Sequence, residues 1–431
     1  MHKRAAVRAC EGMIWRRFRN RRCATSEPAM RNGSCAAVAE GDSSAGATGV
    51  LMVVDGATAA LAALNLGWFT TVSQFLDSYT YILFLAIAFL LYLAYPRVRA
   101  NRLKIVAFVI GLVIAGVLAL GLQEMYAQPR PCAELLGDLK LASCPTDYSF
   151  PSGHTTFAFV FAGASLGTSF FPLFILLSIL VAMSRIYLGI HTLNDVAGGM
   201  VIALSVYFAV ETCLRNLFPQ LIPRKERELL PKVQLAVEKV EWKSGFAFEV
   251  RRRVAHVTFG TIIIALIYFL GRAKTELLLM MALFTGMTFM HLRMERKRAL
   301  LIDELFELLE RPMVMPAKGA FMYVIGALLA LAFLGDIDKV LAVIAILAFG
   351  DGAATLAGKL VSSGPRLPHN PEKTLAGAAA FFAFGSAAAY PFVGVVAFPV
   401  TLICAMVETL DLKIDDNLLV PLAATIIFSF I

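Results

Sequence analysis

The sequence is poor in charge. Only 16% of its 431 residues are charged, whereas 58% are hydrophobic, and soluble domains usually carry about a quarter charged residues. This balance excludes a soluble globular protein and a disordered one. The apolar residues form many separate runs, so the chain is predicted to cross a bilayer repeatedly, as an all-α polytopic membrane protein.

Cysteine is scarce and scattered, and the sequence contains no CxxC motif or Cys/His cluster. This excludes the usual zinc patterns. Only Cys132 and Cys144 lie close together in one loop, which predicts a disulfide if that loop faces an oxidising compartment. The alternative is two unpaired thiols.

The excess of positive over negative charge is concentrated at the N-terminus. The formal net charge is +8, and eight basic residues against one acid in residues 1–22 account for +7 of it. The rest is nearly neutral, so the net charge gives no support to a nucleic-acid-binding body. Residues 1–51 are interpreted as a disordered basic tail that either lies in the cytoplasm or touches lipid headgroups. Another possibility is that translation starts at Met52.

About twelve apolar runs are long enough to span. They lie at about 79–95, 104–123, 155–169, 171–188, 195–213, 255–270, 276–291, 320–334, 339–349, 375–389, 391–407 and 418–431. Residues 51–69 are either a poor first span or an interfacial helix. Polar residues 223–247 predict an amphipathic cytoplasmic linker between membrane domains at 52–222 and 248–431, and residues 293–312 predict a helix along the membrane surface.

Basic loops orient the spans. Arg97, Arg99, Arg102 and Lys104 crowd one short loop, and loops rich in Lys and Arg remain cytoplasmic. The loops at about 124–154 and 189–194 are then expected outside, and those at 350–374 and 408–417 in the cytoplasm.

Three polar segments meet at the expected outer ends of the first domain's spans: QEMYAQPRP (123–131), PSGH (151–154) and SRIYLGIHTLNDV (184–196). Arg130 and Arg185 offer forked donors suited to phosphate. Ser152 and Gly153 open a helix whose N–H groups bind anions.

Two histidines complete this set. His191 and Asp195 are four residues apart and share a helix face, so the carboxylate can orient the imidazole as a nucleophile. His154 is predicted to donate a proton to the leaving alkoxide. Each feature taken singly has an ordinary alternative. PSGH is also typical of a helix start, and His191 with Asp195 is also typical of a hydrogen-bonded pair within a helix. Arg130 and Arg185 are also typical of residues that anchor a helix at the membrane interface.

These blocks resemble the type 2 phosphatidic acid phosphatase superfamily over about residues 52–215. The family pattern is Lys-x6-Arg-Pro, Pro-Ser-Gly-His and Ser-Arg-x5-His-x3-Asp. Gln123 stands where the family has Lys, and we expect it to contact phosphate as well. The resemblance implies hydrolysis of a lipid phosphate or pyrophosphate through a phosphohistidine, without a metal or other cofactor.

A second polar set lies in FGDGAATLAGK (349–359), PHNPEKTLAG (368–377) and ETLDLKIDDN (408–417). Glycines there allow backbone to approach phosphates, and carboxylates offer oxygen ligands for Mg²⁺. The predicted nucleotide-binding residues are Gly350, Gly352, Gly358, Lys359, Lys373 and Lys318, and the predicted metal ligands are Asp351, Asp415 and Asp416. The alternatives are small-residue helix packing and a solvated acidic turn.

This half resembles the CTP-dependent lipid kinases, the family of dolichol kinase, phytol kinase and fungal-type diacylglycerol kinase. The blocks are the Arg-rich run ending in His256, Pro316-x-Lys318-Gly319, Gly350-Asp351, Lys373-Thr374-x-x-Gly377, and Glu408 through Asn417. Ala376 replaces an acid common in the family. The resemblance implies CTP as donor, Mg²⁺, and Asp351 as a catalytic residue.

Together the halves predict a bifunctional enzyme that recycles a polyprenyl or dolichyl phosphate carrier. It would lie in the cytoplasmic membrane, or in the endoplasmic reticulum of a eukaryote, with membrane lipids and CTP as its partners. The alternatives are a phosphatidate phosphatase with a diacylglycerol kinase, a phosphatase with a non-catalytic kinase-like half, and an anion transporter. A transporter predicts inverted repeats with broken helices near mid-bilayer, whereas the two halves differ in sequence.

The expected orientation is testable by labelling. A cysteine introduced near Gly364 should resist impermeant thiol reagents in intact cells, and one near Asp138 should react, because positive loops stay cytoplasmic. The reverse labelling pattern would invert the whole topology.

Overall fold

The computed structural model describes residues 55–133, 140–141, 143–295, 317–361, 364–410 and 412–431, without the side chains of 224–245 and 372. The chain divides into two units, Met1–Leu51 and Met52–Ile431, and every described residue belongs to the second. The predicted tail lies outside the described residues, as does most of the predicted surface helix at 293–312.

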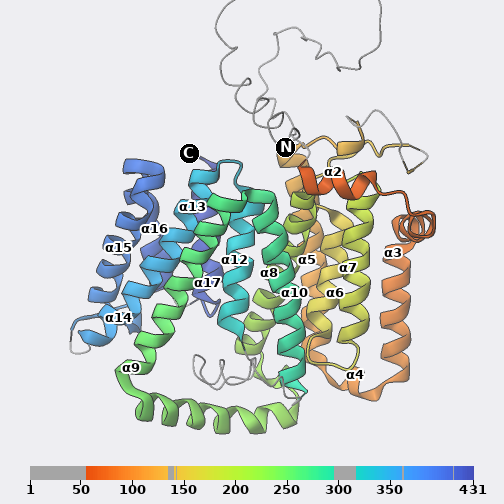
Figure 1. The fold of residues 1–431 in the computed structure, drawn as a ribbon. Coiled ribbons are helices and arrows are strands. Elements are labelled where there is room, and N and C mark those ends of the chain that lie inside the picture. The colour runs from red at the N-terminus through yellow and green to blue at the C-terminus, as the bar shows by residue number, and fades with distance from the viewer. Residues whose placement is uncertain (1–54, 134–139, 142, 296–316, 362–363, 411) are drawn as a thin grey trace, which may run out of the picture. The chain divides into compact units, whose positions relative to one another are not determined.

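The described residues are almost wholly helical (Figure 1), which confirms the all-α class. The first half contains α2 (Gly56–Ala63), α3 (Gly67–Ala94), α4 (Pro96–Ala100), α5 (Arg102–Tyr126), α6 (Gly153–Ser165), α7 (Phe171–Tyr187) and α8 (Leu193–Leu217), with 3₁₀ turns at Pro131–Ala133 and Pro219–Leu221. The second half contains α9 (Arg224–Leu270), α10 (Arg272–Met294), α12 (Lys318–Phe333), α13 (Ile337–Ala345), α14 (Gly352–Leu360), α15 (Leu375–Val393), α16 (Ala397–Thr409) and α17 (Asp416–Ser429).

Seven helical segments in the described part of the chain are long and apolar enough to cross a membrane. One of them, Leu375–Thr409, comprises α15 and α16, and three shorter apolar helices (α7, α12 and α17) accompany the seven. The sequence predicted about twelve spans. The chain is an integral membrane protein. In the segment at 51–69, which the sequence left open, the residues described from 55 onward form the 8-residue α2 and the start of α3.

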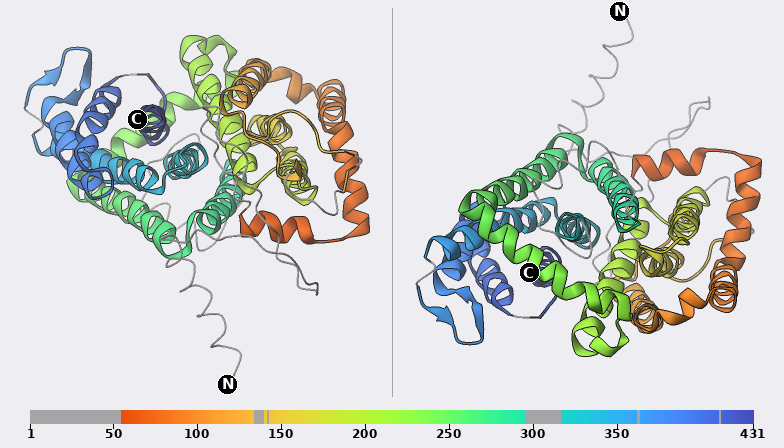
Figure 2. Two further views of the ribbon diagram at one scale, coloured as in Figure 1. Left: turned by 90° about the horizontal axis from the view of Figure 1, so that it is seen from above. Right: turned by 90° about the horizontal axis from the view of Figure 1, so that it is seen from below.

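Helices α5 to α8 form the first bundle, with the 13-residue α6 at its centre. Both views of Figure 2 show the orange α3 at the outer edge of this bundle. Its apolar side chains face outward, Trp68 and Phe89 being 70% and 61% exposed. Apolar side chains directed away from the protein are the expected lipid-facing surface of a membrane helix.

Helix α12 packs against α8 and joins the two halves. It is apolar on every side and buried along almost its whole length, as expected for a central helix. Near its C-terminal end, Asn194 Nδ2 donates to the Ala332 carbonyl (3.1 Å) and the Tyr126 hydroxyl donates to the Phe333 carbonyl (3.4 Å).

The linker differs from its prediction. Instead of a separate amphipathic helix, α9 runs unbroken for 47 residues, from Arg224 to Leu270, and includes the next span. The expected boundary at 247/248 falls inside this helix. In Figure 1 the first part of α9 crosses the ends of the other helices and its later part lies alongside them.

The glycine-rich segment also differs from its prediction. Residues 350–360 were expected in a cytoplasmic loop, but Ile346–Asp351 form a π-helical turn between α13 and α14. Such turns are rare and are found most often at functional sites. Two unpredicted short strands follow, β1 (Arg366–Leu367) and β2 (Asn370–Thr374), paired antiparallel, and a 3₁₀ turn at Gly394–Val396 separates α15 from α16.

Cys132 and Cys144 form a disulfide, as predicted, with Cα atoms 5.8 Å apart. Cys132 packs in a small apolar cluster with Phe69, Tyr187 and Ile190. The bond therefore ties the loop before PSGH to the chain segment that precedes His191.

Removing this bond is expected to destabilise the protein. Cys132→Ser should lower the free energy of unfolding by about 3 kcal/mol, the loop-closure effect of a short loop. Cys213→Ser is the matched control, because that cysteine is free. Chemical denaturation in detergent, with and without reductant, measures both, and an unfolding midpoint that ignores reductant would contradict the prediction.

Candidate functional sites

The PSGH turn is fixed to the start of α8. Ser152 caps α6, since its hydroxyl accepts from the Thr155 N–H at 3.5 Å. The Ser152 N–H donates to the Asp195 carbonyl at 2.9 Å. Gly199 allows this approach, because a Cβ there would lie 2.6 Å from the Ser152 carbonyl oxygen. Two of the predicted blocks therefore meet through backbone contact.

Asp195 is anchored by its own helix end. Its carboxylate accepts from the Thr192 N–H at 2.7 Å, while the Thr192 hydroxyl accepts from the Asp195 N–H at 3.1 Å. This reciprocal pair is a capping box. Gln128 Nε2 lies 3.4 Å from the other carboxylate oxygen, so the Asp195 side chain is held on both oxygens.

His191 lies between Asp195 and Arg130, and its side chain is buried. Its Nε2 is 3.0 Å from Arg130 Nη1. Arginine has donors only, so Nε2 accepts and Nδ1 carries the proton, facing Asp195 Oδ2 at 3.5 Å. Burial lowers the pKa of His191, although Asp195 acts in the opposite direction. The imidazole is therefore neutral at neutral pH, with its Nε2 lone pair toward Arg130.

Arg130 is paired with Asp147, which the sequence analysis did not select. Arg130 Nη2 and Nε donate to the two Asp147 carboxylate oxygens at 2.8 Å and 3.1 Å. Burial alone would raise the pKa of Asp147, but the hydrogen bond and charge of Arg130 lower it below its usual range. A two-oxygen anion thus occupies the fork of Arg130, while the Asp147 side chain itself is 63% exposed.

Arg185 is fully buried and paired with Asp77 of α3. Its Nη1 donates to Asp77 Oδ1 at 2.6 Å, and its Nε donates to Ser184 Oγ at 3.3 Å. Among the described residues its buried Nη2 has no hydrogen-bond partner. A buried unsatisfied donor costs free energy, so Arg185 keeps one donor available for a further acceptor.

His154 is directed toward α3. Its Nε2 lies 3.2 Å from the Asp77 carbonyl oxygen, and its Nδ1 lies 3.5 Å from the Tyr81 hydroxyl. The Tyr81 ring packs on the imidazole with centroids 4.7 Å apart. Tyr81 is another contact that the sequence analysis missed.

Gln123 was expected to contact phosphate, but its Nε2 donates to the Pro151 carbonyl at 2.9 Å. It is buried beneath the PSGH turn. An amide is neutral and can satisfy a backbone carbonyl, which explains its position. In this structure Gln123 therefore holds the turn.

The second constellation gathers three carboxylates. Asp351, Glu408 and Asp416 each bring one oxygen to within 4.8 Å of the others. Lys373 of β2 pairs with Glu408 and, at 3.2 Å, with Asp416. Burial would lower the pKa of Lys373, but the two carboxylates raise it, so it stays charged.

Basic groups from α9 reach the same cluster. Arg253 pairs with Asp351, and His256 Nε2 lies 3.4 Å from Asp351 Oδ2. Both belong to the Arg-rich run that carried the second resemblance. Carboxylate oxygens are the ligands that Mg²⁺ prefers, so the three acids fit a divalent cation beside a cationic wall.

Asp415 differs from its predicted position as a metal ligand. Its carboxylate caps α17 by accepting from the Asn417 N–H at 3.1 Å, and burial raises its pKa to about 6. Glu408 stands in the cluster instead. Lys318, at the start of α12, acts on Asp415 electrostatically.

The predicted phosphate-cradling glycines pack against other helices instead. A Cβ at Gly350 would meet the Phe381 ring at 3.1 Å, one at Gly352 would meet Val257 at 3.0 Å, and one at Gly358 would meet Thr374 at 3.2 Å. Lys359 lies 3.3 Å from Glu249 of α9. Small residues here serve close helix approach, which favours the packing alternative.

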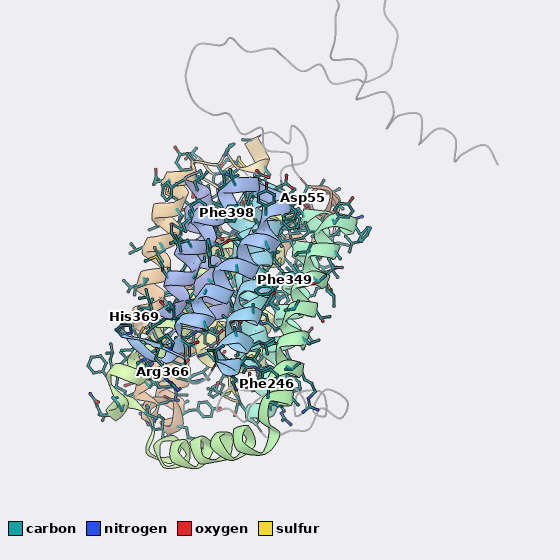
Figure 3. All side chains as sticks on the ribbon, turned by 90° about the vertical axis from the view of Figure 1, so that its left-hand side faces the viewer. Asp55, Phe246, Phe349, Arg366, His369 and Phe398 are labelled. Atoms are coloured by element: carbon teal, nitrogen blue, oxygen red, sulfur yellow. A yellow bond between two sulfur atoms is a disulfide. The ribbon has the colours of Figure 1, made fainter. Side chains whose placement is uncertain are left out.

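The two clusters lie at opposite ends of α12. Its N-terminal end contacts the second cluster's segment, where Asn417 Nδ2 donates to the Gly319 carbonyl at 3.1 Å. Its C-terminal end contacts Asn194, next to Asp195. Sixteen residues make about 24 Å of helix. Figure 3 agrees, since Arg366 and His369 lie at one end of the bundle and Asp55 at the other.

Comparison with known proteins identifies the first half. The PAP2 superfamily matches residues 104–219. The bacitracin transport permease protein BcrC of Bacillus licheniformis is 33% identical over 137 residues, which are 30% of this chain and 64% of that protein. An uncharacterized protein of Methanocaldococcus jannaschii is 30% identical over 183 residues, which are 42% of this chain and 93% of that protein.

An undecaprenyl-diphosphatase of Sulfolobus acidocaldarius is 36% identical over 106 residues, which are 24% of this chain and 52% of that protein. The chain therefore spans only 64% and 52% of the two relatives that carry a functional name. No solved structure matches it.

The close approach at Gly199 is testable. Gly199→Ala places a methyl group against the Ser152 carbonyl and should lower the free energy of unfolding by about 1–3 kcal/mol, the usual effect of overpacking. The control is Gly116→Ala in α5, where nothing lies within 4 Å of an added Cβ. Thermal unfolding in detergent measures both, and equal midpoints would refute the contact.

Proposed function

Because the chain belongs to the PAP2 superfamily through residues 104–219, we propose that its first half is a lipid phosphate or pyrophosphate phosphatase. The observation that carries this proposal is His191 Nε2, which faces Arg130 at 3.0 Å with its lone pair unprotonated. A buried nucleophile beside a guanidinium has the arrangement that attack on phosphorus requires.

In the first step, Nε2 of His191 attacks phosphorus and the bond from phosphorus to the lipid oxygen breaks. Arg130 holds phosphate oxygens in place of its present partner Asp147, and Arg185 offers its available Nη2 donor. Asp195 stabilises the positive charge that develops on the ring. His154 gives a proton to the departing oxygen, so a lipid alcohol, or a lipid monophosphate from a pyrophosphate, is released.

In the second step, water attacks the phosphohistidine. The phosphorus–nitrogen bond breaks, inorganic phosphate leaves, and Nε2 recovers its lone pair. His154 now accepts the proton from water, which reverses its first role. No metal is needed, because the arginines supply the positive charge.

A polyprenyl chain is the favoured substrate tail. One relative is named as an undecaprenyl-diphosphatase, and α3 presents a long apolar surface beside His154. A glycerolipid is the alternative, because both lipid types offer apolar tails to such a surface.

For the second half we propose Mg²⁺-dependent phosphoryl transfer from CTP to a lipid alcohol. The observation that favours it is the group of Asp351, Glu408 and Asp416, with Lys373 and Arg253 beside it. The three acids would hold the metal, which supplies charge neutralisation for the transferred phosphoryl group when bound. Lys373 and Arg253 are placed to bind nucleotide phosphates, and Asp351 orients His256.

The two activities would form a cycle. The phosphatase site is expected outside and the kinase site inside, because the clusters stand at opposite ends of α12 and the basic loops mark the cytoplasmic end. A carrier lipid dephosphorylated outside would be rephosphorylated inside after crossing the membrane.

The sites should be separable. In purified full-length protein, His191→Ala should reduce phosphate release from polyprenyl phosphates at least a hundredfold and leave CTP-dependent phosphorylation of polyprenol unchanged. Asp351→Asn should do the reverse, because the sites share no side chain. Phosphate release and transfer of labelled phosphate from CTP with Mg²⁺ measure the two activities.

Each variant is the control for the other. Loss of both activities in a folded single variant would contradict two independent sites. The wild-type protein is also tested with CTP and with ATP, on polyprenols and on diacylglycerols. If it transfers phosphate to neither lipid from either nucleotide, the proposed kinase activity of the second half is refuted.

A further inference from the structure

Helix α3 lies outside residues 104–219, which the PAP2 superfamily matches, yet it contributes to the phosphatase site. Asp77 and Tyr81 are four residues apart and share one face of α3. That face meets Arg185 through the Asp77 carboxylate and His154 through the Tyr81 ring. The site therefore includes residues of α3 that are not part of the superfamily's sequence motifs.

Both ring nitrogens of His154 face α3. The Asp77 carbonyl, 3.2 Å from Nε2, can only accept a hydrogen bond, so Nε2 carries the proton. Nδ1 is then an acceptor. The Tyr81 hydroxyl, 3.5 Å away at the outer limit of a hydrogen bond, is its donor.

This tautomer raises a chemical problem for proton donation. A neutral imidazole that gave up its Nε2 proton alone would become an imidazolate, which is very unstable in water. The ring can act as an acid only if Nδ1 gains a proton as Nε2 loses one. In the described structure the group placed to supply it is the Tyr81 hydroxyl.

We propose that Tyr81 is a positioning residue that holds His154 and resupplies its proton. The inference rests on the proposed phosphatase function. When the phosphorus–oxygen bond breaks, its electron pair stays on the lipid oxygen, which takes the Nε2 proton. The Tyr81 proton moves to Nδ1, and the negative charge ends on the phenolate.

The proton balance closes over the cycle. A phenol is a far stronger acid than an alkyl alcohol, so the charge passes to the better anion. The Arg185 guanidinium lies on the same face of α3 and stabilises it. When water attacks the phosphohistidine, its proton returns through His154 to the phenolate.

The surroundings of Tyr81 suit a departing lipid oxygen. Tyr81 is 41% exposed, and its neighbours Ile82 and Leu85 are 66% and 48% exposed on the lipid-facing surface of α3. His191, by contrast, is 1% exposed and faces Arg130. The nucleophile is thus deep in the bundle and the proton donor is beside the lipid.

The test compares leaving groups. Tyr81→Phe keeps the ring contact with His154 and removes only the hydroxyl. Tyr79→Phe is the matched control, because Tyr79 carries the same hydroxyl on the same helix while its ring packs on Phe75. Full-length variants in detergent are assayed on a medium-chain alkyl phosphate, whose alkoxide needs a proton, and on p-nitrophenyl phosphate, whose anion leaves without one.

Tyr81→Phe should lower the rate of leaving-group release in a single turnover about tenfold or more on the alkyl phosphate, and less than about twofold on p-nitrophenyl phosphate, since in this first step acid catalysis serves only the poor leaving group. Tyr79→Phe should change neither rate. Equal losses on both substrates, or no loss on either, would overturn the role of Tyr81 while leaving the phosphatase intact. A wild-type protein that hydrolyses neither substrate would instead overturn the proposed phosphatase.

Discussion

A charge within an apolar helix bundle needs a counter-charge, and this constraint organises both sites. Arg185 is fully buried and has Asp77, Arg130 has Asp147, Asp351 has Arg253, and Glu408 has Lys373. Arg253 and Asp351 are both largely buried, and removing one member of such a pair costs about 3–5 kcal/mol, because the other charge is left uncompensated. The pairs join α3 to α7, α9 to the π-helical turn between α13 and α14, and β2 to α16. The same contacts that neutralise charge therefore also fix the elements that carry it.

The central helix α12 separates the charged residues of the first site from those of the second. It is apolar on all sides and leaves its polar contacts to its ends, at Gly319 and at Ala332 with Phe333. Apolar packing therefore separates the two sets over most of the length of this helix. The two halves also differ in sequence, and each carries its own set of charged residues at one end of α12. Helix α12 acts as a spacer between these sets.

Much of this could be predicted from the sequence. Long apolar runs fixed the fold class, and the short spacing within PSGH and between His191 and Asp195 fixed local geometry. The disulfide followed from two cysteines in one loop. Asp77, Tyr81 and Asp147 were missed because their partners lie 108, 73 and 17 residues away, beyond any local pattern. One signal was available for Asp77. A single acid inside an apolar span costs free energy, so such a residue usually marks a functional site.

Two of the predicted sets have a second explanation in the structure. Glycines at 350, 352 and 358 were assigned to phosphate, whereas a missing Cβ serves close helix packing equally well. Asp415 was assigned to metal, whereas an aspartate at a helix start is first of all a cap. Sequence gives a residue's chemical capacity, and tertiary structure decides which capacity is used. At the first site the carboxylates of Asp77 and Asp147 pair with Arg185 and Arg130, so a phosphate that binds there competes with these carboxylates for the guanidinium donors.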